Sequence, residues 1–220
     1  MKLHGSSLAP PLDAPRTVHV ESVPSTQELA RSLPIGSVVV ANFQSAGRGR
    51  LDRRWSAPPG TALLASFVVK RHPLLSLAAG VAAAEACGEP VRLKWPNDLM
   101  LDGRKAGGIL VEVAEAKAIV GIGINLTWAP PGAAQLDQPR DQLLEKLAQA
   151  LAVWSVAQPD RILGRWRELS VTLGQRVRVE LPGGVREGVA EDIDASGALI
   201  VDGVAVSAGD VIHLRAGSGP

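Results

Sequence analysis

The dipeptide Asp102-Gly103 constrains the fold of this chain more than any other feature of its sequence. It separates two apolar stretches, 99–101 and 105–113, and Asp-Gly in such a place is the strongest short signal for a β-hairpin. Two adjacent glycines, Gly107-Gly108, interrupt the second stretch, which indicates close approach of a ligand or another backbone. The stretch 118–126 repeats this pattern. The centre of the chain therefore predicts antiparallel strands, and the hairpin would give Lys105 a rigid base.

The remaining stretches predict a mixed sheet backed by helices. A first helix would open at Ser25 through a capping box with Glu28. Further strands and helices follow from hydrophobic periodicity and from Gly and Pro at element ends. The strands are expected at 17–21, 37–41, 61–70 and 91–95, and the helices at 74–87, 141–157 and 159–173.

From residue 175 onward the hydrophobic period changes from helical to alternating. Several short strands at this spacing predict a small barrel. They are expected at 176–180, 185–193, 198–201 and 211–214. The predicted fold class is therefore α+β, with a larger domain in residues 17–173 and a small β-barrel domain in residues 174–220. Residues 1–16 carry three prolines and no apolar period, and we expect a flexible lead-in there.

Composition narrows the function classes. A hydrophobic content of 46% favours a well-packed globular protein over a disordered one. The 23 basic residues are scattered among 22 acidic ones, so bulk charge indicates no role in binding DNA. The single cysteine, Cys87, is expected to be a small buried side chain, and no His/Cys spacing suggests zinc. Without a signal peptide or a long apolar run, we expect a cytoplasmic protein that does not contact membranes.

The loop 42–50, Asn-Phe-Gln-Ser-Ala-Gly-Arg-Gly-Arg, is the candidate site. It leaves a predicted buried strand, and strand ends often hold ligands in α/β-type folds. Its glycines let the backbone approach a ligand, while Arg48 and Arg50 offer planar charged groups suited to carboxylate and phosphate. Gln44 adds an amide donor and acceptor. By itself this loop is equally typical of a solvated turn or a nucleic-acid contact.

Three separate segments together resemble the biotin protein ligases: Gly47-Arg48-Gly49-Arg50, then Lys94-Trp95-Pro96-Asn97-Asp98, then the stretch from Gly103 to Leu110 that contains Lys105. The resemblance runs from about Thr17 to Arg215. It implies a class II synthetase-like catalytic domain and a C-terminal Src-homology-3-like barrel. Some members of this family carry an N-terminal winged-helix DNA-binding domain, which sixteen residues cannot form. The monofunctional, enzyme-only branch is therefore expected, with no DNA partner.

The resemblance also implies the reaction of a biotin–[acetyl-CoA-carboxylase] ligase. Biotin and ATP, with Mg²⁺, would give biotinyl-5'-adenylate and pyrophosphate. The biotinyl group would then pass to a lysine of the biotin carboxyl carrier domain of a carboxylase. A carboxylate meeting a triphosphate requires fixed cations near both anions. Whether the chain forms a homodimer is left open.

The resemblance assigns roles to individual residues. Lys105, Arg48 and Arg50 are the expected catalytic residues, and Asp98 would orient the acceptor lysine. Gln27 replaces the usual Asn, and Asp52 stands where family members often have Gly. The residues implied at biotin are Ser25, Thr26, Gln27, Gln44, Gly47, Arg48, Gly49, Arg50, Lys105 and Gly107. Those implied at ATP are Arg48, Arg50, Trp55, Lys94, Asn97 and Asn125.

Two other functions compete with this one. A lipoate–protein ligase shares the catalytic fold and the adenylation chemistry, although the first two segments favour biotin. A non-catalytic module, either a ligand sensor or an RNA-binding protein with a terminal barrel, would not turn over ATP. The presence of Lys105 together with both arginines favours an enzyme.

Overall fold

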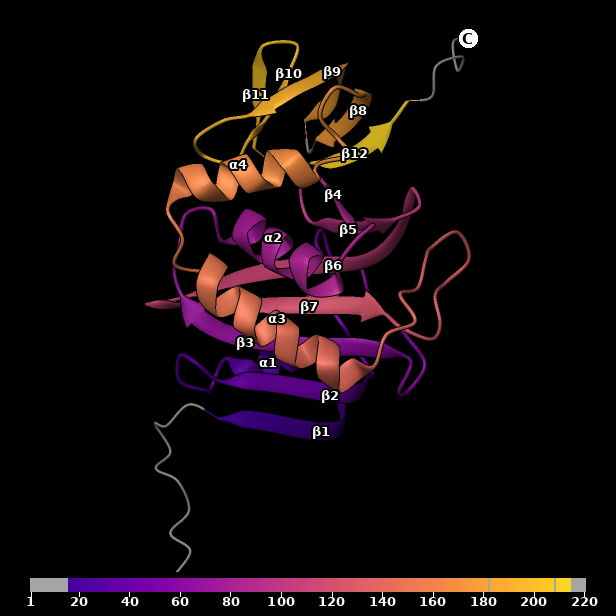
Figure 1. Cartoon of the computed structure of the whole chain (residues 1–220), viewed down its shortest axis with the longest axis vertical. Coiled ribbons are helices and arrows are strands. Elements are labelled where there is room, and N and C mark those ends of the chain that lie inside the picture. The colour runs from indigo at the N-terminus through magenta and orange to yellow at the C-terminus, as the bar shows by residue number, and fades with distance from the viewer. Residues whose placement is uncertain (1–15, 182, 208, 215–220) are drawn as a thin grey trace, which may run out of the picture.

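The structure is a computed structural model that describes residues 16–181, 183–207 and 209–214. The predicted flexible lead-in, apart from residue 16, lies outside the described residues. Two sheets and four helices make up the described chain (Figure 1). No helix among these residues is long and apolar enough to cross a membrane.

The first sheet has seven strands in the order β1-β2-β3-β7-β6-β5-β4. Only β1 and β2 pair in parallel, and every other neighbouring pair is antiparallel, so the predicted mixed sheet is confirmed. The predicted hairpin at Asp102-Gly103 is also confirmed, since both residues have positive φ, at 49° and 71°. The strands are β1 (Thr17–Val23), β2 (Val38–Gln44), β3 (Ala62–Lys70), β4 (Arg92–Lys94), β5 (Asp98–Leu101), β6 (Arg104–Ala114) and β7 (Lys117–Asn125).

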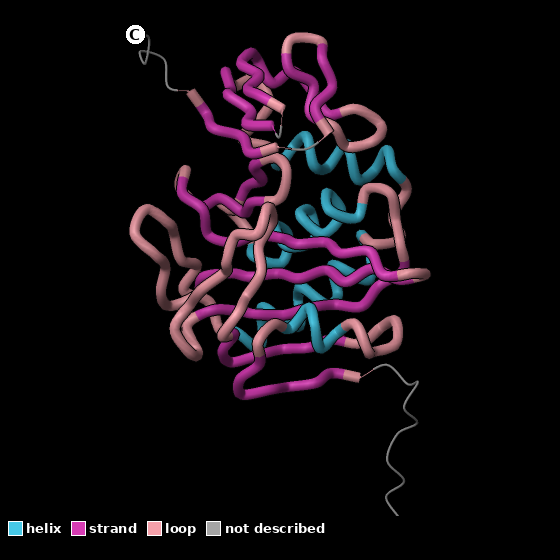
Figure 2. Tube along the Cα trace, turned by 180° about the vertical axis from the view of Figure 1, so that it is seen from behind, coloured by secondary structure: helices cyan, strands magenta, loops and turns pink. Residues whose placement is uncertain are grey.

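Helices cover both faces of this sheet. Because side chains alternate along a strand, Val39, Val68 and Ile119 pack on one face beneath α1 (Thr26–Ala30). Their neighbours Val40, Phe67 and Val120 face the main core on the other side. That core is covered by α2 (Leu75–Cys87), α3 (Arg140–Trp154) and α4 (Pro159–Leu169). Figure 2 shows α1 and long loops on the face that the other helices leave open.

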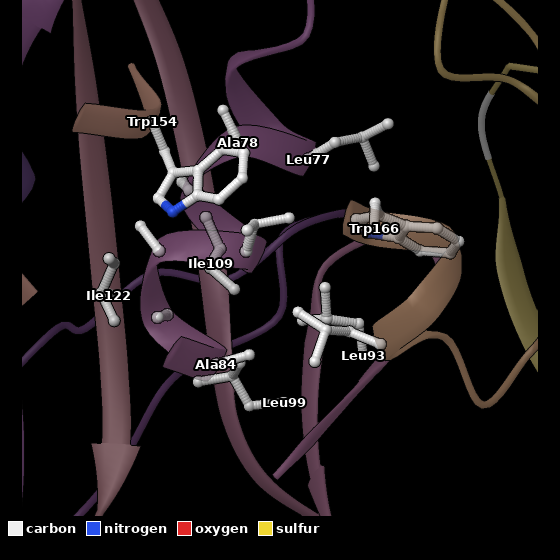
Figure 3. Packing of buried hydrophobic residues seen from close by; sticks show 14 of the residues in the cluster. Leu77, Ala78, Ala84, Leu93, Leu99, Ile109, Ile122, Trp154 and Trp166 are labelled. Carbon is white, nitrogen blue, oxygen red and sulfur yellow. The ribbon is translucent and has the colours of Figure 1, made fainter. Parts of the chain in front are cut away.

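Helix α2 is buried on nearly every side because it lies between the sheet and the other two long helices. Its alanines let these layers approach closely, and Figure 3 shows Ala78 and Leu77 between Trp154 and Trp166. Gly80 continues this packing, because a Cβ there would lie 3.4 Å from a methyl of Leu93. The predicted stop at Gly88 is confirmed by its positive φ of 79°.

The second sheet has five antiparallel strands in the order β11-β10-β9-β8-β12. The predicted barrel is thus a sheet whose strand pairing, in the described part of the chain, does not close. Val204–Val206 was not predicted as a strand, because the turn at Asp202-Gly203 divides one apolar stretch into two short strands. The strands are β8 (Arg176–Leu181), β9 (Gly184–Ile193), β10 (Leu199–Val201), β11 (Val204–Val206) and β12 (Asp210–His213).

Hydrogen bonds connect the second sheet to α4 and to the end of β4 in the first sheet. The indole nitrogen of Trp95 donates to the carbonyl of Gly197 at 3.1 Å, and Arg167 on α4 binds both carboxylate oxygens of Asp192. The backbone of Val171 donates to Leu93 on β4 at 2.8 Å. In this arrangement β12 lies beside the loop that follows β2, where Asp210 pairs with Arg53.

Candidate active site

A cavity of about 350 Å³ lies on the α1 face of the first sheet. It is bounded by the sheet, by α1, by the loop after β2 and by β12 of the second sheet. Each of the three sequence segments singled out above contributes to its wall. The predicted site residues that line it are Ser25, Thr26, Gln27, Gln44, Arg48, Gly49, Arg50, Trp55, Lys94, Asn97, Asp98 and Lys105.

Glycines form the floor of the cavity. Gly108 on β6 pairs with Gly123 on β7, and both present bare backbone on this face. Trp55 occupies the space above Gly123, where an added Cβ would lie only 2.5 Å from the indole. Gln27 occupies the corresponding space above Gly121, at 3.0 Å. The glycines that interrupt these strands therefore make room for side chains from α1 and from the loop.

The α1 wall carries polar atoms without partners. The predicted capping box is wrong, because the Ser25 side chain makes no cap hydrogen bond. Its Oγ is instead buried without a partner among the described residues, as is Oε1 of Gln27. Thr26 is satisfied, since its backbone N and its Oγ1 both donate to Oε1 of Gln44, at 2.7 and 3.0 Å. Buried polar atoms are normally hydrogen-bonded, so Ser25 and Gln27 favour a polar ligand at this wall.

Cations from three segments surround the same cavity. Lys105 pairs with Asp98 at 2.6 Å and lies 6.0 Å from the centre of the Trp55 ring. Arg50 donates to Oδ1 of Asn97 at 3.2 Å, and burial lowers its pKa against the opposing effect of nearby carboxylates. Burial likewise lowers the pKa of Lys94, which Asp98 opposes. The cavity therefore combines positive charge with a partly desolvated setting, which strengthens attraction for an anionic ligand.

The loop after β2 folds back on itself and covers this cavity. The backbone of Trp55 donates to Gly47 at 3.0 Å, and that of Gly49 donates to Arg53 at 2.7 Å. At its tip, Leu51 and Asp52 both have positive φ, 52° and 57°. Asp tolerates this conformation better than most residues, which explains how Asp52 is accommodated at the tip of the loop.

The second sheet supplies a wall that the sequence did not reveal. Glu180, Asp210, Val211 and Ile212 line the cavity. Arg53 from the loop forms an ion pair with Asp210, and Arg50 donates to the carbonyl of Gly209 at 3.4 Å. These partners are separated by more than 150 residues in the sequence, and no local pattern predicts them.

Three residues expected at biotin or ATP do not line the cavity. Gly47 lies against the loop's own backbone, where a Cβ would come within 2.3 Å of the carbonyl oxygen of Trp55. Gly107 faces the core on the opposite side of the sheet, where a Cβ would come within 2.9 Å of Leu99. Asn125 is buried and donates to the carbonyl of Ala134 at 2.9 Å, so it holds the loop after β7.

Basic side chains outnumber acidic side chains in the wall of the cavity. No group of three or more His, Cys, Asp or Glu side chains that could hold a metal ion occurs in the described residues. Asp98 and Asp210, the aspartates of the cavity wall, are each paired with a basic residue. Such a wall suits a divalent ion that is held mainly by the oxygens of a bound anionic molecule and by water, more than one held by protein carboxylates.

Comparisons with known proteins agree with this geometry. Residues 19–127 match the model of the biotin/lipoate A/B protein ligase family, and residues 172–214 match that of the biotin protein ligase C-terminal domain. A biotin–[acetyl-CoA-carboxylase] ligase of Mycobacterium tuberculosis is 38% identical over 82% of this chain and 80% of its own length. One from Paracoccus denitrificans is 35% identical over 81% of this chain and 89% of its own length.

Solved structures give the same result. The biotin protein ligase from Aquifex aeolicus, in complex with biotin and ATP, matches with a TM-score of 0.80 and 27% identity. The match covers 91% of this chain and 99% of that one.

Proposed function

Because this chain belongs to the biotin protein ligase family, we propose that it activates biotin with ATP and then transfers the biotinyl group to a lysine of a carboxylase's carrier domain. The relatives from M. tuberculosis and P. denitrificans are named as ligases for acetyl-CoA carboxylase, and the A. aeolicus structure contains biotin and ATP. The observation that carries the proposal for this chain's own residues is the meeting of Lys94, Lys105, Arg48 and Arg50 around one cavity.

In the first step, a carboxylate oxygen of biotin attacks the α-phosphorus of ATP and pyrophosphate leaves. Two anions must approach each other, and negative charge grows on the phosphoryl oxygens in the transition state. Lys105, aimed from the hairpin, can stabilise that charge, and Arg48 and Arg50 can hold the carboxylate and phosphates. Mg²⁺ is expected to arrive with ATP, bound to its phosphates and to water.

The neutral end of biotin suits the α1 wall. Its ureido group offers one carbonyl acceptor and two N–H donors. Ser25 Oγ can donate to the carbonyl, and Gln27 Oε1 can accept from an N–H, so the two unpartnered atoms would both be satisfied. Thr26 and Gln44 already bond each other and would hold this wall in shape.

The covering loop protects the intermediate. Biotinyl-adenylate is a mixed anhydride that water would hydrolyse, so a closed cavity is required between the two steps. Trp55 over the glycine floor and Arg50 against Asn97 provide that cover. In the second step, the acceptor's lysine nitrogen attacks the carbonyl carbon and AMP leaves. The carboxylate of Asp98 lies at the cavity wall, where it binds Lys105, and we propose that it orients the lysine of the acceptor protein.

The direct test is incubation of the chain with biotin, ATP, Mg²⁺ and a biotin carboxyl carrier domain. The acceptor is expected to gain the mass of one biotinyl group, and lipoic acid in place of biotin should give no product. An unmodified acceptor, or modification by lipoate instead, would contradict the proposal. Independence from DNA and a cytoplasmic location stay predictions, and the oligomeric state stays open.

A further inference from the structure

The carboxylate of Glu112 binds two arginine side chains. Glu112 lies on β6, on the same face as Gly108, and its side chain is only 16% exposed. Its Oε1 binds Nη2 of Arg48 at 2.9 Å, and its Oε2 binds Nη2 of Arg31 at 2.6 Å. Glu112 does not line the cavity itself, so it can influence a ligand only through these partners.

The two arginines come from different elements, and only Arg48 lines the cavity. Arg48 comes from the covering loop, and Arg31 ends α1, the helix that carries Thr26 and Gln27. The end of α1 has a second anchor, because Nζ of Lys117 donates to the carbonyls of Arg31 and Leu33, at 2.8 and 2.6 Å. Loss of the ion pair between Arg31 and Glu112 should therefore leave α1 in place.

The side chain of Arg48 makes the other ion pair with Glu112. Within the part of the chain that the structure describes, Glu112 is the acidic partner of the Arg48 side chain, which is about half exposed (48%). A guanidinium carries five N–H groups, so one carboxylate oxygen occupies part of it and leaves the remainder for a ligand. An exposed ion pair alone stabilises a fold very little. Its effect on a flexible arginine beside a cavity is to limit the directions that the side chain can take.

We propose that Glu112 is a positioning residue that aims the Arg48 guanidinium into the cavity. The proposal rests on the proposed function, in which Arg48 binds the biotin carboxylate and the adenylate. Glu112 stands on a strand of the sheet, so its Oε1 can hold Arg48 whether or not Arg31 binds the other carboxylate oxygen. If Glu112 instead competed with the ligand for Arg48, its removal would improve biotin binding, so the two roles predict opposite signs.

The test measures KM for biotin and kcat in biotin-dependent ATP–pyrophosphate exchange. For Glu112→Gln we expect KM for biotin to rise about 10-fold while kcat changes less than about 3-fold, the range for one charge-assisted contact at a half-exposed side chain. Glu112→Asp, which keeps the charge, should recover part of the loss. Arg31→Gln is the matched control and should stay within about 2-fold, because Lys117 still anchors α1.

A double variant separates positioning from a general structural role. In an Arg48→Gln background, Glu112→Gln should raise KM no further, because its effect passes through Arg48. The inference is overturned if Glu112→Gln lowers KM or leaves it unchanged, if Arg31→Gln is equally impaired, or if the effect persists without Arg48. Should Glu112→Gln not fold, Glu112→Asp against Arg31→Gln gives the same comparison. A wild-type chain without biotin-dependent exchange would refute the proposed function itself.

Discussion

Replacement of Gly123 by Ala tests how the covering loop depends on the glycine floor. An added Cβ would lie 2.5 Å from Cε2 of Trp55 and 2.8 Å from Cδ2, whereas ordinary contact begins at 3.4 Å. The indole must therefore move away by about 1 Å. Trp55 belongs to a loop and not to the sheet, so we expect most of the strain to displace the loop instead of unfolding the sheet.

The magnitude follows from that displacement. Overpacking in a rigid core costs about 1–3 kcal/mol, and we expect the loss in unfolding free energy to stay below about 1 kcal/mol because the loop yields. A shift of about 1 Å in groups that hold a substrate can reduce a rate by about 100-fold. For Gly123→Ala we therefore expect biotin-dependent ATP–pyrophosphate exchange to fall by about 10- to 100-fold.

The assay pairs this exchange rate with urea unfolding, and Trp55→Ala is the matched background. In that background the added methyl group meets no indole, so Gly123→Ala should have almost no further effect. The reasoning is refuted if Gly123→Ala retains full exchange activity, or if its loss of activity is the same with and without the Trp55 side chain.

Three further predictions concern other contacts. Arg50→Gly, which removes the bond to Asn97, should still form adenylate but release it, seen as free adenylate or labelled bystander lysines; finding neither would count against a closing loop. Asp98→Asn should leave pyrophosphate exchange intact and slow transfer to the acceptor by about 100-fold, and equal losses in both steps would remove its orienting role. The hydrogen bond from Arg167 lowers the pKa of Asp192, so this pair should stabilise the fold by up to about 1 kcal/mol at neutral pH. That contribution, absent from Asp192→Asn, should be full above the ordinary Asp pKa and vanish as pH falls through the lowered one; a difference in unfolding free energy that persists in acid would contradict it.

The elements that the sequence predicted correctly depend on local rules. Asp102-Gly103 defines its hairpin because both residues accept positive φ, and Gly88 ends α2 for the same reason. The capping box at Ser25 failed because its Oγ is buried at the cavity wall and makes no hydrogen bond to the helix N-terminus. A local pattern cannot report which of two hydrogen-bonding environments a buried hydroxyl will meet.

The parts of the site that the sequence could not supply come from distant contacts. The wall formed by Asp210 depends on how the second sheet packs beside the loop, and the Glu112–Arg48 pair depends on the register of β6. Asn125 shows another limit of local patterns, since the structure uses this polar residue at a strand end to hold a neighbouring loop. The three segments predicted to meet do share one cavity, because each lies at or beside a strand of the same sheet.

The most direct test of the central claim is the exchange activity of Lys105→Ala. In the proposed reaction the Lys105 ammonium stabilises charge where carboxylate and α-phosphate join, and loss of one such group typically lowers a rate by about 100- to 1000-fold. The variant should keep its thermal unfolding midpoint, since the lysine side chain is 43% exposed, and should lose ATP–pyrophosphate exchange to that extent. A folded Lys105→Ala that exchanges pyrophosphate at the wild-type rate would contradict the account.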